Sequence, residues 1–163
     1  MLSETEFICG GVELIDSIRE MWHQLNKHAS KRSPFFSEHF SERTFQLRKE
    51  EMVSKAKSCR LRIEIARDTM ASRDLGYCAS SIDYFGNGEI ESLFVDDEAR
   101  RRGVGDALMR RTLEWMRQQG ARSTVVFTVY GDESIFSFYA RYGFRPKMVM
   151  LESSFDQSHT EQP

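Results

Sequence analysis

The sequence has little that would build a disulfide framework or a metal centre. Its three cysteines, Cys9, Cys59 and Cys78, are odd in number and lie far apart, without the spacing of zinc ligands or of a C-x-x-C pair. Scattered cysteines of this kind are typical of reduced thiols in a cytosolic protein. We therefore expect packing thiols, a cytoplasmic protein and no bound metal.

An excess of positive charge and a long apolar run are also lacking. Lys and Arg number 23 against 25 Asp and Glu, so the formal net charge is −2, whereas nucleic-acid-binding domains usually present a basic face. No stretch approaches the roughly 20 apolar residues of a transmembrane helix. The N-terminus has no basic segment followed by an apolar one. These absences argue against nucleic acid and membrane as partners.

What is present is the composition of a globular protein. The chain has 163 residues, of which 40% are hydrophobic and 29% charged. That length suffices for one domain with a hydrophobic core. No internal repeat interrupts it, and only residues 156–163 have the composition of a flexible tail. We expect a single domain over residues 1–163.

The spacing of apolar residues predicts alternating strands and helices. Two helices are expected within residues 11–57, the second capped by Ser41 and running to about Lys57. A later helix, residues 104–119, ends at Gly120. The turn Gly86-Asn87-Gly88 returns one strand antiparallel to its predecessor. Strands are predicted at residues 6–9, 60–67, 76–84 and 89–95. The order, strand-helix-helix-strand-strand-strand-helix-strand-helix-strand, predicts an α/β fold.

The most informative segment is Arg100–Ala107, which reads Arg-Arg-Arg-Gly-Val-Gly-Asp-Ala. It joins a predicted strand to a predicted helix. Gly103 and Gly105 lack Cβ atoms, so the backbone can turn sharply and bring N–H groups to an anion. The helix N-terminus adds further N–H groups, and the arginines attract a polyphosphate. The alternative is a solvated helix entrance. A Walker loop is excluded because G-x-x-x-x-G-K-[ST] is missing, and a dinucleotide fingerprint because its third glycine would fall at Leu108.

Two ordered motifs resemble the GCN5-related N-acetyltransferases, the GNAT family. Arg100-x-x-Gly103-x-Gly105 matches that family's [QR]-x-x-G-x-[GA] motif. The preceding Leu93-Phe94-Val95 resembles the strand with which the family holds pantetheine. Downstream, Phe138–Phe144 resembles the signature F-Y-x-x-x-G-F. The resemblance covers residues 89–152 and implies a GNAT fold, with a mixed, mostly antiparallel sheet flanked by helices.

The same resemblance implies acetyl-CoA as the acyl donor and assigns residues to it. Acceptor-side helices are then expected at residues 11–57. Asp132 departs from the family's N-x-x-A pattern, and a carboxylate cannot donate a hydrogen bond as an asparagine amide does. The residues that the resemblance assigns to the cofactor are Leu93, Phe94, Val95, Arg100, Arg101, Arg102, Gly103, Val104, Gly105, Asp106, Ala107, Asp132 and Phe138.

Glu89 and Glu91 are the candidate bases. They lie two residues apart in a predicted strand and therefore point to the same face; the alternative is that both are solvent-facing carboxylates. By resemblance, Glu89 falls where histone-type members carry a catalytic glutamate, and Glu91 where polyamine-type members do. The strand Ile90–Val95 is more similar to the polyamine type. Glu91 is therefore the preferred base, acting through a water molecule on the acceptor's ammonium.

Tyr139 is the candidate acid. The match to F-Y-x-x-x-G-F places it where the family's acid protonates the departing thiolate of coenzyme A. The alternative is a core position, because Ile135, Phe138, Tyr139 and Tyr142 form a helical apolar stripe. The presence of both Glu91 and Tyr139 favours an enzyme over a binding module.

The resemblance implies an N-acetyltransferase that moves an acetyl group from coenzyme A to a primary amine by direct attack in a ternary complex. We expect a small-molecule acceptor, polyamine-like or amino-acid-derived. A protein lysine or an N-terminus is an alternative acceptor. A non-catalytic acyl-CoA-binding sensor is an alternative of another class. A homodimer is left open.

Overall fold

The structure is a computed structural model and describes residues 4–32 and 37–153. The expected flexible tail, residues 156–163, lies outside these residues. The chain divides into two compact units, Met1–Val129 and Tyr130–Pro163, which are described separately. None of the helices in the described residues is long and apolar enough to cross a membrane.

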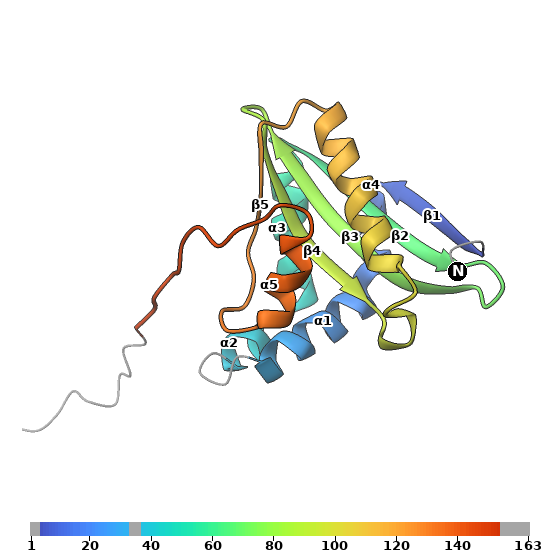
Figure 1. The fold of residues 1–163 in the computed structure, drawn as a ribbon, viewed down its shortest axis with the longest axis horizontal. Coiled ribbons are helices and arrows are strands. Elements are labelled where there is room, and N and C mark those ends of the chain that lie inside the picture. The colour runs from blue at the N-terminus through green and yellow to red at the C-terminus, as the bar shows by residue number, and fades with distance from the viewer. Residues whose placement is uncertain (1–3, 33–36, 154–163) are drawn as a thin grey trace, which may run out of the picture. The chain divides into compact units, whose positions relative to one another are not determined.

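A sheet in the order β1-β2-β3-β4-β5 forms the centre of the first unit (Figure 1). The first four strands are antiparallel to their neighbours, and β5 pairs parallel with β4. This arrangement confirms the predicted mixed, mostly antiparallel sheet. The strands are β1 (Thr5–Gly10), β2 (Cys59–Asp68), β3 (Arg73–Asp83), β4 (Asn87–Val95) and β5 (Ser123–Val126).

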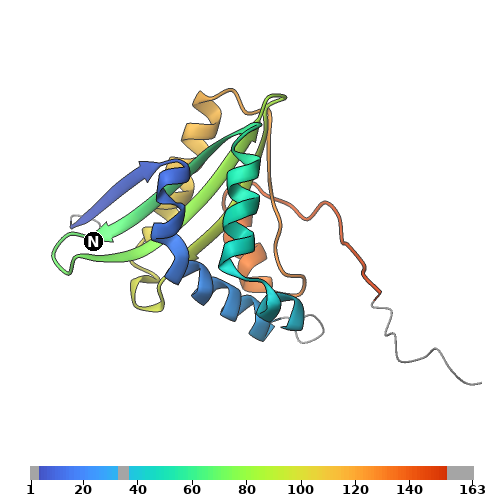
Figure 2. The same ribbon diagram turned by 180° about the vertical axis from the view of Figure 1, so that it is seen from behind.

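Helices cover both faces of this sheet. Figure 1 shows α4 (Val104–Gln118) across one face, and Figure 2 shows α1 (Arg19–Arg32) and α3 (Phe45–Lys55) on the other. The face of α4 towards the sheet buries Val104, Leu108, Met109 and Met116, as their helical spacing predicts. The remaining elements are the 3-10 helices η1 (Val12–Ile18) and η2 (Asp97–Ala99), α2 (Ser37–Glu42), and α5 (Glu133–Ala140) of the second unit.

The main apolar core lies between the sheet and the helices η1, α1 and α3. Trp22 belongs to it and is 5% exposed. Burying side chains of this size stabilises the fold by about 1.5–3 kcal/mol each. The buried members of the cluster are Ile15, Ile18, Met21, Trp22, Phe45, Met52, Ile63, Ile65, Tyr77, Ala79 and Phe94.

A buried charge lies beneath α4. Glu64 of β2 is fully buried, and its Oε2 accepts a hydrogen bond of 3.1 Å from Arg62. Arg111 of α4 donates from Nε to Glu64 Oε1, and its guanidinium lies 4.6 Å from the ring centroid of Phe7. A buried carboxylate needs such partners, because an unpaired one is costly in a medium of low dielectric constant. The contact therefore fastens α4 to the centre of the sheet.

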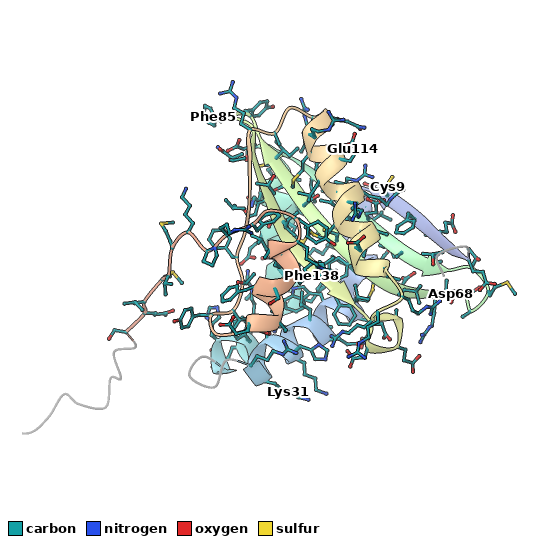
Figure 3. The ribbon with its side chains drawn as sticks, in the orientation of Figure 1. Cys9, Lys31, Asp68, Phe85, Glu114 and Phe138 are labelled. Atoms are coloured by element: carbon teal, nitrogen blue, oxygen red, sulfur yellow. The ribbon has the colours of Figure 1, made fainter. Side chains whose placement is uncertain are left out.

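Two local predictions are wrong. Ser41 does not cap the second long helix: α3 begins at Phe45, after Thr44, whose Oγ1 accepts from the N–H of Leu47 at 3.2 Å. Thr44 directly precedes the first apolar helical residue, which makes it the better cap. Cys9 is exposed rather than packed (Figure 3), because it lies on the edge strand β1.

The last predicted strand is not confirmed either. Residues 145–153 form neither helix nor strand. A strand exists only where a neighbouring strand supplies ladder hydrogen bonds. Among the described residues nothing pairs with this segment.

Cys78 behaves as predicted for a packing thiol. It is fully buried, and burial raises the pKa of its thiol to about 12. A thiol with so high a pKa stays protonated near neutral pH and is therefore a poor nucleophile.

Candidate active site

The turn between β3 and β4 sets the direction of β4, the strand that carries Glu89 and Glu91. The Asp83 carboxylate accepts hydrogen bonds from the N–H groups of Phe85 and Asn87, at 2.9 and 2.8 Å. Gly86 has a φ of 83°, a conformation that glycine adopts without strain. The antiparallel return of β4 is thus confirmed, with Phe85 at the tip of the turn (Figure 3). Asn87 is already part of β4.

A β-bulge interrupts β4 at Glu91. Ile90 faces Ser80 on β3 and Ser92 faces Ala79, so Glu91 has no residue opposite it. A bulge of this kind leaves one extra residue unpaired and turns two successive side chains to nearly the same side. Accordingly, Glu91 contacts side chains of α3, and Ser92 Oγ accepts from the Tyr77 hydroxyl at 3.0 Å on the same face.

Two cations of α3 bind the Glu89 and Glu91 carboxylates. Lys55 Nζ lies 2.5 Å from Glu89 Oε2 and 2.5 Å from Glu91 Oε1. Ser81 Oγ donates to Glu91 Oε1 at 2.6 Å, and Arg48 Nη2 donates to Glu91 Oε2 at 3.2 Å. The two carboxylates share one face, as their spacing predicts. The Glu91 side chain is only 4% exposed, whereas that of Glu89 is 27% exposed.

These contacts keep the Glu91 carboxylate and the Lys55 ammonium charged near neutral pH. Burial raises the pKa of Glu91, but hydrogen bonds from Lys55 and Ser81 outweigh it and hold that pKa below its usual value. Burial lowers the pKa of Lys55, but its hydrogen bonds to Glu89 and Glu91 outweigh this effect and raise it. A carboxylate whose pKa is lowered is a weaker proton acceptor.

The loop after β4 forms a turn suited to an anion. Arg101 and Gly103 have positive φ angles of 64° and 83°, and Gly103 is the N-cap of α4 without any side-chain cap. The first helical hydrogen bond runs from the N–H of Ala107 to the carbonyl of Gly103, at 2.9 Å. The N–H groups at Val104 and Gly105 therefore have no acceptor within the helix. They point along the positive end of the helix dipole.

The three arginines of this loop differ in their contacts. Arg100 donates to the carbonyl of Val95 at 3.3 Å, lies 3.3 Å from Nδ1 of His28, and pairs with Asp97 at 2.8 Å. Arg100 therefore links the end of β4, the loop and α1.

Arg101 and Arg102 make fewer contacts with the rest of the protein than Arg100 does. Arg102 lies 3.7 Å from Asp68, and Arg101 is exposed. The side chains of Arg100 and Arg102 are 46% and 34% exposed, so all three arginines present charge to an incoming polyphosphate, and Arg100 makes the most contacts with the protein.

The strands β4 and β5 separate just before this loop. Their parallel ladder ends at the pair Ile90 and Val126. Beyond that pair, among the described residues, no strand lies beside Leu93–Val95 on the β5 side. Main-chain groups of this stretch can therefore bind an extended ligand in place of a neighbouring strand.

In the second unit, Asp132 and the aromatic motif shape α5. The Asp132 carboxylate accepts from the N–H groups of Ser134 and Ile135 at 3.1 and 3.4 Å, so it caps the helix. The Tyr139 ring makes edge contacts with Phe138 and Phe144, with centroids 5.2 and 5.6 Å apart. Asp132 thus has a structural role of its own. The assignment of Tyr139 as an acid stays a prediction.

The sequence profile of the Acetyltransferase (GNAT) family matches residues 22–144. The chain belongs to this family. It is 29% identical over 84 residues to an uncharacterized N-acetyltransferase of Methanocaldococcus jannaschii. That match covers 48% of this chain and only 37% of the relative, so the chain spans well under half the length of that protein.

Solved structures show the same fold. A GCN5-related N-acetyltransferase of Ralstonia eutropha has a TM-score of 0.71 and 18% identity, over 92% of this GNAT chain and 98% of that one. The aminoglycoside acetyltransferase AAC(6')-Iy, solved with a bisubstrate analogue of coenzyme A and acetylneamine, has a TM-score of 0.61 and 20% identity. The match covers 94% of this chain and 100% of the aminoglycoside acetyltransferase chain. At 18% and 20% identity, these likenesses show that the chain has the fold of these proteins.

The cations of α3 were not identified from the sequence. Arg48 and Lys55 are seven residues apart, which places them on one side of a helix. The spacing could be seen in the sequence, but nothing in the sequence indicated which strand this side of the helix would face. A shallow, open pocket lined by His39, Glu42, Arg43 and Glu51 was not predicted either.

Proposed function

We propose that this GNAT protein transfers an acetyl group from acetyl-CoA to the primary amine of a small-molecule acceptor. The observation that carries the proposal is the turn at Gly103, with the uncapped N-terminus of α4, directly after a stretch of β4 that has left its parallel partner. A pyrophosphate and an extended pantetheine arm need these two features, in this order.

The residues present fit acetyl-CoA. The N–H groups at Val104 and Gly105 would hold pyrophosphate oxygens, with Arg101 and Arg102 adding charge-assisted contacts. The main chain of Leu93–Val95 would bind the amides of the pantetheine arm. When bound, acetyl-CoA supplies an acetyl group activated as a thioester. Fixing that group beside the acceptor accounts for a large share of the expected rate enhancement.

Of the carboxylates Glu89 and Glu91, one would accept the acceptor's proton and the other would position α3. An ammonium must lose a proton before its nitrogen can attack, and that proton would pass to a carboxylate directly or through a water molecule. Glu91 was preferred from the sequence, but Lys55, Arg48 and Ser81 all donate to its oxygens. Glu89 is more exposed and contacts Lys55 through Oε2. We therefore assign proton transfer to Glu89 and the positioning of α3 against β4 to Glu91.

Tyr139 would supply the second proton. Its hydroxyl would give a proton to the sulfur atom as the carbon–sulfur bond breaks, so that coenzyme A leaves as a thiol. The support for this role is the F-Y-x-x-x-G-F motif, which forms the end of α5 and a turn at Gly143, where φ is 87°.

An assay of thiol release from acetyl-CoA against a panel of small amines, lysine peptides and peptide N-termini tests the proposal. We expect turnover with small amines. Glu89→Gln should lower kcat/KM most near neutral pH and lose much of that defect at high pH, where more free amine is present. Glu91→Gln should mainly reduce stability.

Three results would contradict this assignment. Turnover only with peptides would make the protein a protein acetyltransferase. Binding of acetyl-CoA without turnover of any amine would make it a sensor. A larger pH-dependent defect in Glu91→Gln than in Glu89→Gln would return the base to Glu91.

A further inference from the structure

Lys55 occupies the place where a cationic acceptor would bind the two carboxylates. Its ammonium bridges Glu89 and Glu91 at 2.5 Å each. Arg48 binds the second oxygen of Glu91 and its main-chain carbonyl, both at 3.2 Å. Two negative charges thus face two positive charges that the protein itself supplies.

One acidic residue of α3 is also paired with cations of the protein. Glu51 pairs with Arg43 at 2.5 Å and lies 3.4 Å from Arg48. Arg43, Arg48 and Lys55 therefore balance Glu51, Glu89 and Glu91. A polycation is attracted to carboxylates that lack counter-charges, and Glu51, Glu89 and Glu91 each have one within the protein.

A free amine competes poorly with Lys55. The ammonium is attached to the C-terminal end of α3, so its effective concentration at the carboxylates is that of an intramolecular ligand, roughly millimolar or higher. Displacing it would also leave a half-buried cation without partners, since the Lys55 side chain is 33% exposed.

We infer that Lys55 is a specificity-determining residue that excludes polycationic acceptors and selects an amine bearing a nearby carboxylate, as in an amino acid or its derivative. An ammonium has three N–H donors. Glu89 and Glu91 take two of them, and the third is left for the acceptor's carboxylate. The inference rests on the proposed function and narrows its acceptor class. The likeness to an aminoglycoside acetyltransferase does not oppose it, because at 20% identity that likeness concerns the fold.

Isothermal titration calorimetry of the full chain saturated with coenzyme A tests the inference without turnover. The probes are spermidine and a panel of amino acids paired with their amides, which keep the amine but lack the carboxylate. We expect the wild type to bind spermidine weakly and to prefer some amino acid over its amide by about tenfold or more. Lys55→Gln should strengthen spermidine binding by about tenfold and abolish the preference.

Two further variants serve as controls. Lys57→Gln removes an exposed cation just beyond α3 and should behave as the wild type. Lys55→Arg keeps the charge and should still exclude spermidine, which a general loosening of α3 would not explain.

The inference fails if the wild type binds spermidine as tightly as Lys55→Gln does. It also fails if no amino acid binds better than its amide. The proposed function is judged separately, by whether acetyl-CoA raises the melting temperature of the wild type and releases thiol with any small-molecule amine.

Discussion

The guanidinium of Arg111 donates to the fully buried carboxylate of Glu64, and this contact joins the helix that carries the anion-binding turn to the second strand of the sheet. The turn itself lies at the N-terminus of α4, more than one helical turn away from Arg111. Because a helix moves as a rigid element, fastening its middle also fixes where its first N–H groups point.

Removing Arg111 should therefore destabilise the protein more than an exposed arginine would. In Arg111→Met, Glu64 keeps only Arg62, and we expect a loss on the order of 2 kcal/mol in the free energy of unfolding, less than for a fully broken buried pair. Chemical denaturation measures it. The double variant Arg111→Met with Glu64→Gln should recover part of the loss, and an unchanged midpoint in Arg111→Met would show that the contact is not stabilising.

Gly103 and Gly105 should respond differently to a methyl group. Gly103 has a φ of 83°, so Gly103→Ala places an L-residue in the left-handed region at a cost of about 1–2 kcal/mol. Gly105 lies inside α4, where Gly105→Ala should cost nothing and can gain at most about 1 kcal/mol. Gly105→Asp should stay folded and yet lose the rise in melting temperature that acetyl-CoA gives the wild type. A normal rise of the melting temperature in that variant would show that the anion does not bind at this turn.

Tyr139→Phe separates acid catalysis from packing. The ring contacts to Phe138 and Phe144 survive the substitution, so the melting temperature should stay close to that of the wild type. If the hydroxyl protonates the leaving sulfur, kcat should fall by about 10²-fold while acetyl-CoA affinity changes little. Single-turnover kinetics would test this, and an unchanged chemical step would leave Tyr139 a packing residue.

The Lys55–Glu91 contact should shape the pH dependence of stability. The pKa of Glu91 is lowered from its ordinary 4.5, so its contribution is complete above that pH and is lost as pH falls through the folded-state pKa. The pKa of Lys55 is raised from 10.5, so its contribution is complete below that pH and is lost as pH rises through the folded-state pKa.

Denaturation midpoints recorded from about pH 3 to pH 7 should therefore flatten in Glu91→Gln relative to the wild type. Glu20→Gln removes an exposed carboxylate of α1 and serves as the control. Identical acid slopes in the wild type and Glu91→Gln would mean that this contact does not contribute to folding.

Periodicity in the sequence was sufficient for the sheet and for α4, because Leu108, Met109 and Met116 repeat at a spacing that only one helix face can bury. Simple alternation in β4 would put Phe94 opposite the face of Glu89 and Glu91. The bulge changes this, and Phe94 joins the core on the α3 side. No local pattern marks that bulge.

Contacts between elements could likewise not be predicted from the sequence. The partners of Glu91 come from residues 36 or more positions away, Ser81 excepted, and their approach depends on how α3 packs on the sheet. The position of Arg48 and Lys55 on one helix face was therefore predictable, whereas their role as counter-charges was not.

The bulge also makes β4 a regular strand with one residue added. Ile90 and Ser92 already face adjacent residues of β3, so a chain from which Glu91 had been deleted would keep its ladder in register and Phe94 on the same face. The sheet has no need of the residue at this position, and a shorter β4 would pair equally well. In this structure the added residue serves the contact with α3, where its carboxylate meets Lys55 and Arg48.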